Sequence, residues 1–259
     1  MTTHDLTGFI RVMDRAASSP VILHVPHASR IIPAHLRPSF VISDAEIEDE
    51  LDAMTDASTD LIADAAPGVS RIDHGLSRLV VDVERFPGDE EEMNRVGMGV
   101  LYTHGSRRQE VRRPSREDRE ALLHYFESYS ATFADLVTRT LRQHGRAVII
   151  DVHSYPTHPL PYELHAGERR PEICIGVDPF HTPKPLIEAV HGAFDGYEFG
   201  ENEPFHGSYV PLRYYGADPR VASVMLEIRR DVYLTGTTPR EATLANLGLR
   251  LGRLVEVAG

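Results

Sequence analysis

Three short segments of the sequence carry polar side chains inside or directly after apolar runs. They are residues 23–27 (Leu-His-Val-Pro-His), residues 150–154 (Ile-Asp-Val-His-Ser) and residues 226–229 (Leu-Glu-Ile-Arg). A lone histidine at the end of a strand is usually a hydrogen-bonded structural residue. Glu227, however, lies within the run Val-Met-Leu-Glu-Ile, where an unpaired carboxylate is costly to bury. Two histidine-bearing segments together with this glutamate favour a functional site.

These residue types suit a metal site. Imidazole nitrogens bind Zn²⁺ well, and a catalytic zinc keeps three protein ligands and one position for water. His27 and His153 are therefore candidate ligands. Asp52, Asp56 and Asp60, each four residues apart, are candidates for the third ligand; the alternative is a solvated acidic stripe on a helix. A further carboxylate nearby could remove a proton from the water as it attacks a carbonyl.

A second aspartate and several missing motifs narrow the chemistry. Asp151 lies two residues before His153, on the same face of a strand, where it could orient a ligand or cap a neighbouring turn. The sequence contains no His-Glu-x-x-His zinc motif, no Gly-x-Ser-x-Gly nucleophile elbow and no glycine-rich phosphate-binding pattern. Metal-assisted hydrolysis is therefore favoured over serine or nucleotide chemistry.

Apolar runs and helix signals alternate along the chain and must position these side chains. Helices are predicted from capping boxes at Ser43 and Thr238, and from Ser115 to a stop at Gly145. The pattern predicts an α/β fold with a mixed, largely parallel central sheet flanked by helices. Ligands of such sheets bind beyond the carboxyl ends of the strands. The runs that suit buried strands are residues 21–23, 79–81, 147–150, 173–177 and 221–228.

The composition is that of an ordinary globular protein, which we expect to form a single domain over residues 1–259. Its 27 Lys and Arg against 39 Asp and Glu give a net charge of −12, which disfavours binding to nucleic acid and to anionic membranes. No apolar run approaches the length of a membrane span. The single cysteine, Cys174, excludes an intrachain disulfide and fits a reducing compartment, so we expect a cytoplasmic protein. The oligomeric state is left open.

Five short motifs, taken in order, resemble the N-formylglutamate amidohydrolase family over about residues 20–255. They are residues 24–29 (His-Val-Pro-His-Ala-Ser), Thr55-Asp56 with Asp60, residues 79–85 (Leu-Val-Val-Asp-Val-Glu-Arg), residues 151–154 (Asp-Val-His-Ser) and residues 226–229 (Leu-Glu-Ile-Arg). This family is similar in fold to zinc carboxypeptidases and to aspartoacylase-type enzymes. The resemblance implies one catalytic zinc at the strand ends of a mixed sheet.

The resemblance also implies roles for individual residues. His27, Asp56 and His153 would hold the zinc, and Glu227 would match the general base and acid. Arg85 resembles the arginine of the relatives' Asp-x-Asn-Arg motif, which grips a substrate carboxylate through two parallel hydrogen bonds. In this sequence a glutamate, residue 84, stands where asparagine is typical.

Further substrate contacts are expected from Ser154, His206 and Arg229. The segment 205–209 resembles a glycine-containing substrate loop, from which His206 or Tyr209 could donate to the oxyanion; the alternative is a packed turn. Arg229 could contact a second anionic group, or form a surface salt bridge. The irregular segment 85–113 is predicted to be a solvated loop or a lid over the site.

The function expected from this resemblance is metal-dependent hydrolysis of the amide bond of an acidic N-acyl amino acid. The leading substrate is N-formyl-L-glutamate, which would yield formate and L-glutamate. One alternative is a zinc hydrolase of the same fold that acts on peptides or on another N-acyl amino acid. Another alternative is a non-catalytic metal-binding homologue.

Overall fold

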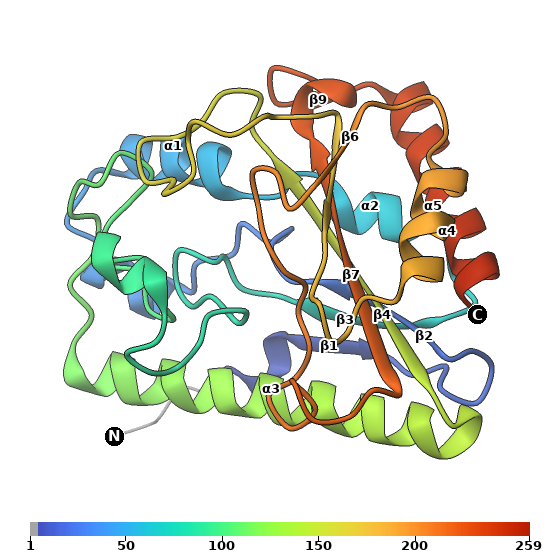
Figure 1. The fold of residues 1–259 in the computed structure, drawn as a ribbon. Coiled ribbons are helices and arrows are strands. Elements are labelled where there is room, and N and C mark those ends of the chain that lie inside the picture. The colour runs from blue at the N-terminus through green and yellow to red at the C-terminus, as the bar shows by residue number, and fades with distance from the viewer. Residues whose placement is uncertain (1–4) are drawn as a thin grey trace.

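The computed structural model describes residues 5–259, and a seven-stranded sheet runs through its centre (Figure 1). The strand order is β1-β3-β2-β4-β7-β5-β6, and only the β1–β3 and β7–β5 pairs are antiparallel in the described sheet. The predicted α/β fold with a mixed, largely parallel sheet is therefore confirmed. The strands are β1 Ile10–Met13, β2 Val21–Val25, β3 Ser70–His74, β4 Ala147–Tyr155, β5 Ile173–Gly176, β6 Phe199–Glu201 and β7 Val221–Arg229, with a small hairpin of β8 Leu234–Thr235 and β9 Thr238–Pro239.

Helices cover both faces of the sheet, so its central strands are buried on both sides (Figure 1). Side chains alternate along β2: Ile22 packs in the apolar cluster that contains the long helix α3, whereas Leu23 packs in the cluster with α2, α4 and α5. This explains the continuous apolar runs that marked these strands in the sequence. The helices are α1 Asp44–Met54, α2 Thr59–Ala63, α3 Arg116–His144, α4 Lys184–Ala193 and α5 Glu241–Ala258, and short 3₁₀ helices cover Thr7–Phe9, Ala34–Ser39, Glu92–Val96 and Arg230–Val232.

The same alternation places the polar residues of the central strands on the α3 side. Ile149 of β4 packs in the α3 cluster, and Asp151 and His153 follow it at the two-residue period of a strand. On β2, His24 has the same relation to Ile22, and its Nε2 lies 2.9 Å from the hydroxyl of Tyr129 on α3. The polar side chains therefore share one face of the sheet near the carboxyl ends of its parallel strands.

Three of the predicted helix boundaries are confirmed. Ser43 and Ser115 both cap helices through reciprocal capping boxes, and Gly145 ends α3 in the left-handed conformation at φ 72°. The capping box predicted at Thr238 is wrong, because Thr238 and the following proline pair in the short β9, and α5 begins at Glu241 without a side-chain cap.

The strand predicted at residues 79–81 is also wrong, although these residues are buried. They form a turn in which the amides of residues 80 and 81 bond to the carbonyl of Ser77. The fully buried guanidinium of Arg112 donates to the carbonyls of Leu79 and Val80 at 3.2 and 2.5 Å. A side chain thus satisfies backbone groups that a neighbouring strand would otherwise bond. Burial lowers the pKa of Arg112 to about 10.

Within residues 5–259, no helix combines the length and the apolar character that crossing a membrane requires.

Candidate metal centre

Three different connections bring the candidate ligands together at the carboxyl edge of the sheet. His153 belongs to β4, and His27 follows β2 after a proline. Asp56 lies in the turn between α1 and α2, where its backbone amide bonds to the carbonyl of His27 at 2.9 Å. The turn is also held by the hydroxyl of Thr59, which donates to the Asp56 carbonyl. These two hydrogen bonds, to the residues that follow β2 and to the start of α2, fix Asp56 beside both histidines.

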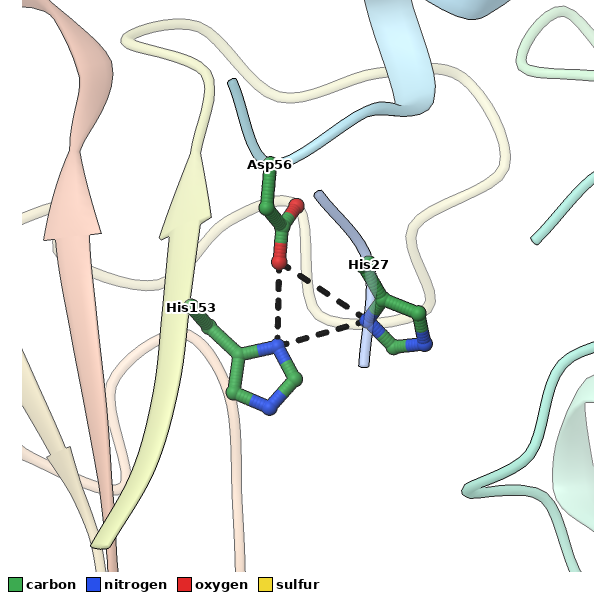
Figure 2. Close-up of side chains that lie close together, drawn as sticks. All are labelled: His27, Asp56 and His153. Atoms are coloured by element: carbon green, nitrogen blue, oxygen red, sulfur yellow. Dashed lines mark hydrogen bonds and ion pairs between the residues drawn. The ribbon is translucent and has the colours of Figure 1, made fainter. Parts of the chain in front are cut away.

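The three side chains point toward one another, and we call them the buried triad (Figure 2). Asp56 Oδ2 lies 3.0 Å from His153 Nδ1 and 3.7 Å from His27 Nδ1, and the two Nδ1 atoms are 3.3 Å apart. All three side chains are at most 4% exposed. Two imidazoles and one carboxylate converging in this way could hold a divalent metal ion.

Carboxylates occupy the far side of both imidazole rings. Asp82 Oδ1 lies 3.0 Å from His27 Nε2, and Asp151 Oδ1 lies 2.9 Å from His153 Nε2. Asp151 also lies 2.9 Å from His24 Nδ1, so it orients the strand-end histidines rather than capping a turn. Histidines that bind metals usually have such a partner on their other nitrogen, which leaves the first nitrogen free to act as a ligand. The donor set therefore fits a metal ion.

Opposite charges in the buried triad and its surroundings shift the pKa values of its members. Burial alone would raise the pKa of Asp56, but hydrogen bonds from His153 and His27 outweigh it and hold that pKa well below its usual range. Burial would lower the pKa of His153, yet the neighbouring carboxylates of Asp151 and Glu84 raise it well above its usual value. The carboxylates of Asp56 and Asp151 therefore stay ionised and favour positive charge between them.

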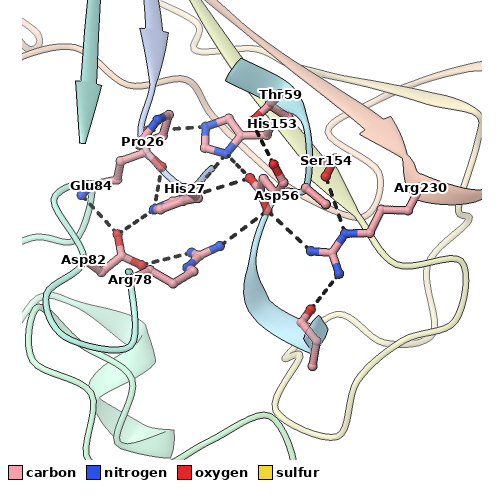
Figure 3. Close-up of polar contacts among 12 residues, drawn as sticks. Pro26, His27, Asp56, Thr59, Arg78, Asp82, Glu84, His153, Ser154 and Arg230 are labelled. Carbon is pink, nitrogen blue, oxygen red and sulfur yellow. Dashed lines mark hydrogen bonds and ion pairs between the residues drawn. The ribbon is translucent and has the colours of Figure 1, made fainter. Parts of the chain in front are cut away.

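Two arginines flank the oxygen of Asp56 that faces away from the histidines (Figure 3). Asp56 Oδ1 lies 3.5 Å from a guanidinium nitrogen of Arg230 and 4.0 Å from one of Arg78. Arg78 also pairs with Asp82 at 2.9 Å, and Arg230 donates to the carbonyl of Ala53 at the end of α1. These contacts leave Oδ2 directed at the two imidazoles.

Glu227 is held beside the triad by strand register. In the parallel pairing of β4 and β7 it lies opposite His153. Its side chain is buried, and Oε2 has no hydrogen-bond partner among the described residues. Burial is the main reason why its pKa is raised, to about 8. A carboxyl group with a raised pKa in a cleft is typical of groups that exchange protons.

A cavity of about 600 Å³ opens over the triad. Its lining includes the seven predicted site residues His27, Asp56, Arg85, His153, Ser154, His206 and Glu227. The eighth, Arg229, lies outside this lining, because its guanidinium turns to Asp231 at 2.7 Å and to the carbonyl of Arg170. The expected substrate contact from Arg229 is therefore corrected, and its neighbour Arg230 lines the cavity instead.

Comparison with known proteins identifies the family. The family model for N-formylglutamate amidohydrolase matches residues 19–234, which is most of the chain. The chain belongs to the N-formylglutamate amidohydrolase family. Members of this family are hydrolases of carbon–nitrogen bonds other than peptide bonds, so this chain is a hydrolase of that class.

This family member is similar to known proteins over most of its length, in sequence or in structure. An N-formylglutamate deformylase of Pseudomonas aeruginosa is 28% identical over 234 residues, which are 85% of this chain and 84% of that protein. The crystal structure of an N-formylglutamate amidohydrolase from Ralstonia eutropha JMP134 superposes with a TM-score of 0.78 at 19% identity, over 95% of this chain and 97% of the other. A gene product of Agrobacterium tumefaciens gives a TM-score of 0.69 at 18% identity, over 95% and 93%.

The structure separates the three aspartates that the sequence offered as the third ligand. Helix α1 ends at Met54, so Asp56 lies beyond it and turns inward. Asp52 stays on the helix surface and pairs with Arg30 at 2.6 Å, and the carboxylate of Asp60 accepts from the amide of Leu61. The helical spacing of the three aspartates is thus broken between Asp52 and Asp56.

Sequence reasoning missed Asp82, Arg78 and Arg230 as members of the site. The signal for Asp82 was its position in the family motif, three residues before Arg85, directly after a buried apolar run. Arg230 directly follows Arg229, which the sequence predicts as a substrate contact.

For segments 85–113 and 205–209 the sequence left two alternatives open, and the structure shows where both segments lie. Part of segment 85–113, namely residues 85, 86 and 90–93, lines the cavity, so the segment contributes to its wall. His206 lines the cavity with a half-exposed side chain, and its Nε2 is 3.2 Å from Glu168. Tyr209 lines the cavity too, and its ring stacks on Phe133 of α3 with centroids 5.5 Å apart.

Proposed function

We propose that this protein hydrolyses N-formyl-L-glutamate to formate and L-glutamate with the help of a zinc ion. The observation that carries the proposal is the convergence of His27, Asp56 and His153 beside Glu227 at one cavity. The family match and the name of the Pseudomonas relative support the substrate. In this proposal the whole chain, residues 1–259, is one catalytic domain, and its location is the cytoplasm.

The three residues of the buried triad would hold the ion through His27 Nδ1, His153 Nδ1 and Asp56 Oδ2. When bound, a zinc ion supplies a Lewis acid that polarises the formyl carbonyl and makes water easier to deprotonate. Asp82 is hydrogen-bonded to His27 Nε2, and Asp151 Oδ1 lies 2.9 Å from His153 Nε2, so with an ion bound each Nδ1 would turn its lone pair to the centre.

Glu227 would carry the proton. Its unpartnered Oε2 takes a proton from the attacking water, whose oxygen forms the new bond to the formyl carbon. The bond between that carbon and the glutamate nitrogen then breaks, and the same carboxyl delivers the proton to the departing amine. Burial of Glu227 among apolar strand residues suits this role, because a desolvated carboxylate is a stronger base than one in water.

Arginines at the cavity wall would bind the carboxylates of the substrate. Arg85 is about three quarters buried and is positioned by Asp82 at 3.3 Å and by the hydroxyl of Tyr102 at 3.5 Å. A guanidinium that is already oriented loses little freedom when it forms two parallel bonds with a carboxylate. Ser154, held 3.4 Å from Arg230, and His206 in the cavity lining are the other proposed contacts.

The experiment is an assay of formate release by purified protein that has first been stripped by a chelator and then reloaded with zinc. N-formyl-L-glutamate should yield formate only after reloading. N-acetyl-L-glutamate and N-formyl-L-methionine serve as matched controls for the acyl group and for the side-chain carboxylate, and both should react more slowly. A zinc-loaded protein that releases no formate from N-formyl-L-glutamate rejects this substrate, and equal rates with and without zinc reject the role of the metal.

A further inference from the structure

Another group of side chains that could hold a metal ion borders the cavity, whose lining includes two of its members. His165, Glu168 and His206 form this group, which we call the rim triad. Glu168 lies between the two histidines, 3.4 Å from His165 Nδ1 and 3.2 Å from His206 Nε2, and the two rings stack with centroids 4.7 Å apart. The three side chains are 45%, 32% and 50% exposed, in contrast to the buried triad.

The donor set of the rim triad is the same as that of the buried triad. Two imidazoles and one carboxylate suit Zn²⁺ and related first-row transition metals, and the candidate ligand atoms lie within 4.8 Å of one another. Because the side chains are exposed, the rings can turn until both nitrogen lone pairs face one ion without any rearrangement of the core. We propose that the rim triad is a second divalent-metal site, filled at higher metal concentration than the buried triad.

The order of filling follows from how each triad is supported. The far nitrogens of His27 and His153 contact Asp82 and Asp151. Among the contacts found within residues 5–259, no carboxylate pairs with the far ring nitrogen of either rim histidine. Partners of this kind are typically worth about 10–100-fold in metal affinity. The exposed side chains also lose rotamer freedom when an ion orders them, which weakens binding further.

An ion at the rim would join two loops that border the cavity. His165 and Glu168 lie between β4 and β5, and His206 lies between β6 and β7. The first loop is anchored by the ion pair of Arg170 with Glu163, and the second by the bond from the Gly207 amide to a side-chain oxygen of residue 202. Both histidines line the cavity, so tying them together narrows the path for substrate. Metal beyond the first equivalent should therefore lower kcat/KM.

Zinc binding measured by equilibrium dialysis on the full-length protein tests the proposal directly. The wild type should bind two equivalents with separate affinities, and His165→Ala should lose the weaker one. His191→Ala is the matched control, because His191 is also exposed and lies 3.9 Å from a glutamate, yet it belongs to no metal-binding group found in the described chain. It should retain both equivalents. Two equivalents in His165→Ala, or only one in the wild type, would overturn the proposal.

Further measurements separate this proposal from the catalytic one. Asp56→Ala should lose the tighter equivalent and keep the weaker, whatever the natural substrate is. In the wild type kcat/KM should fall over the zinc range in which the second equivalent binds, and this fall should be absent in His165→Ala. Light scattering over the same range should show a constant mass. A mass that rises with zinc would mean that the ion bridges two copies, and it would overturn a site within one chain.

Discussion

The buried triad and the rim triad share their residue types but differ in what holds them. Each has two histidines and one carboxylate, with polar contacts of similar length. The buried triad is carried by a strand and by turns bonded to the sheet, and its side chains are at most 4% exposed. The rim triad lies on two loops, and its side chains are about one third to one half exposed.

This difference shows that the donor set alone does not define a catalytic centre. In the buried triad, carboxylates fix the rings, and Arg78 and Arg230 hold the unused oxygen of the aspartate. A site built on rigid elements with such support keeps its geometry, whereas a site on loops is less precise. The buried triad, moreover, has Glu227 beside it, a carboxyl group whose Oε2 has no hydrogen-bond partner among the described residues.

The largest effect is expected from Glu227→Gln. The amide has nearly the same shape but cannot accept the proton of the attacking water, so kcat should fall by about 10²–10⁴-fold. Zinc content should be unchanged, because Glu227 is not a member of the buried triad. Initial rates of formate release at saturating substrate, together with elemental analysis of the same sample, give both numbers. A variant that retains more than a tenth of the rate would contradict the role of this residue.

The next effect concerns stability. A ligand that binds only the folded state at 1,000 times its dissociation constant stabilises that state by about 4 kcal/mol. For a chain of this size, the gain corresponds to a rise of roughly 8–16 °C in Tm. Zinc should therefore raise the Tm of the wild type in scanning calorimetry. Asp56→Ala should lose this rise, whereas His165→Ala should keep it when only one equivalent is added. Equal rises in the wild type and Asp56→Ala would show that the ion binds elsewhere.

Asp82→Asn probes the support of the buried triad. Asparagine keeps the shape but replaces a charged acceptor beside His27 Nε2, so zinc affinity should fall by about 10–100-fold. Competition with a chelator of known affinity measures the change. Asp52→Asn is the matched control, since Asp52 pairs with Arg30 on the surface of α1. If both variants bind zinc as tightly as the wild type, support from Asp82 is not what distinguishes the two triads.

Much of the architecture could be predicted from sequence because it follows from local patterns. The apolar runs of β2, β4, β5 and β7 and the caps of α1 and α3 each need only a few neighbouring residues to form. The failure at residues 79–81 has a non-local cause, whereas the failure at Thr238 comes from a short hairpin that takes up the residues before the helix. A buried guanidinium, Arg112, satisfies the carbonyls of the first segment, and Leu234 pairs with Pro239 in the second.

The candidate site shows the same division. His27, His153 and Glu227 were visible because polar residues in or after an apolar strand are unusual. The choice of Asp56 depended on the family resemblance, since helical spacing treated it like Asp52. The contact of Asp82 with His27 and the contact of Arg230 with Asp56 join residues 55 and 174 positions apart, and no pattern in a single sequence encodes them. The rim triad was missed for the same reason, because it unites two distant loops.

The smallest effect is expected from Glu168→Gln, the same chemical change as at Glu227 but placed in the rim triad. Ion pairs between exposed side chains contribute only about 0.2–1 kcal/mol, so the free energy of unfolding should change by no more than that. With one equivalent of zinc, kcat should stay close to the wild-type value, while affinity for the second equivalent falls because a carboxylate ligand is lost. Urea denaturation, formate release and dialysis measure the three quantities. A loss of kcat as large as that of Glu227→Gln would give Glu168 a catalytic role like that of Glu227, and the distinction between the two triads would then fail.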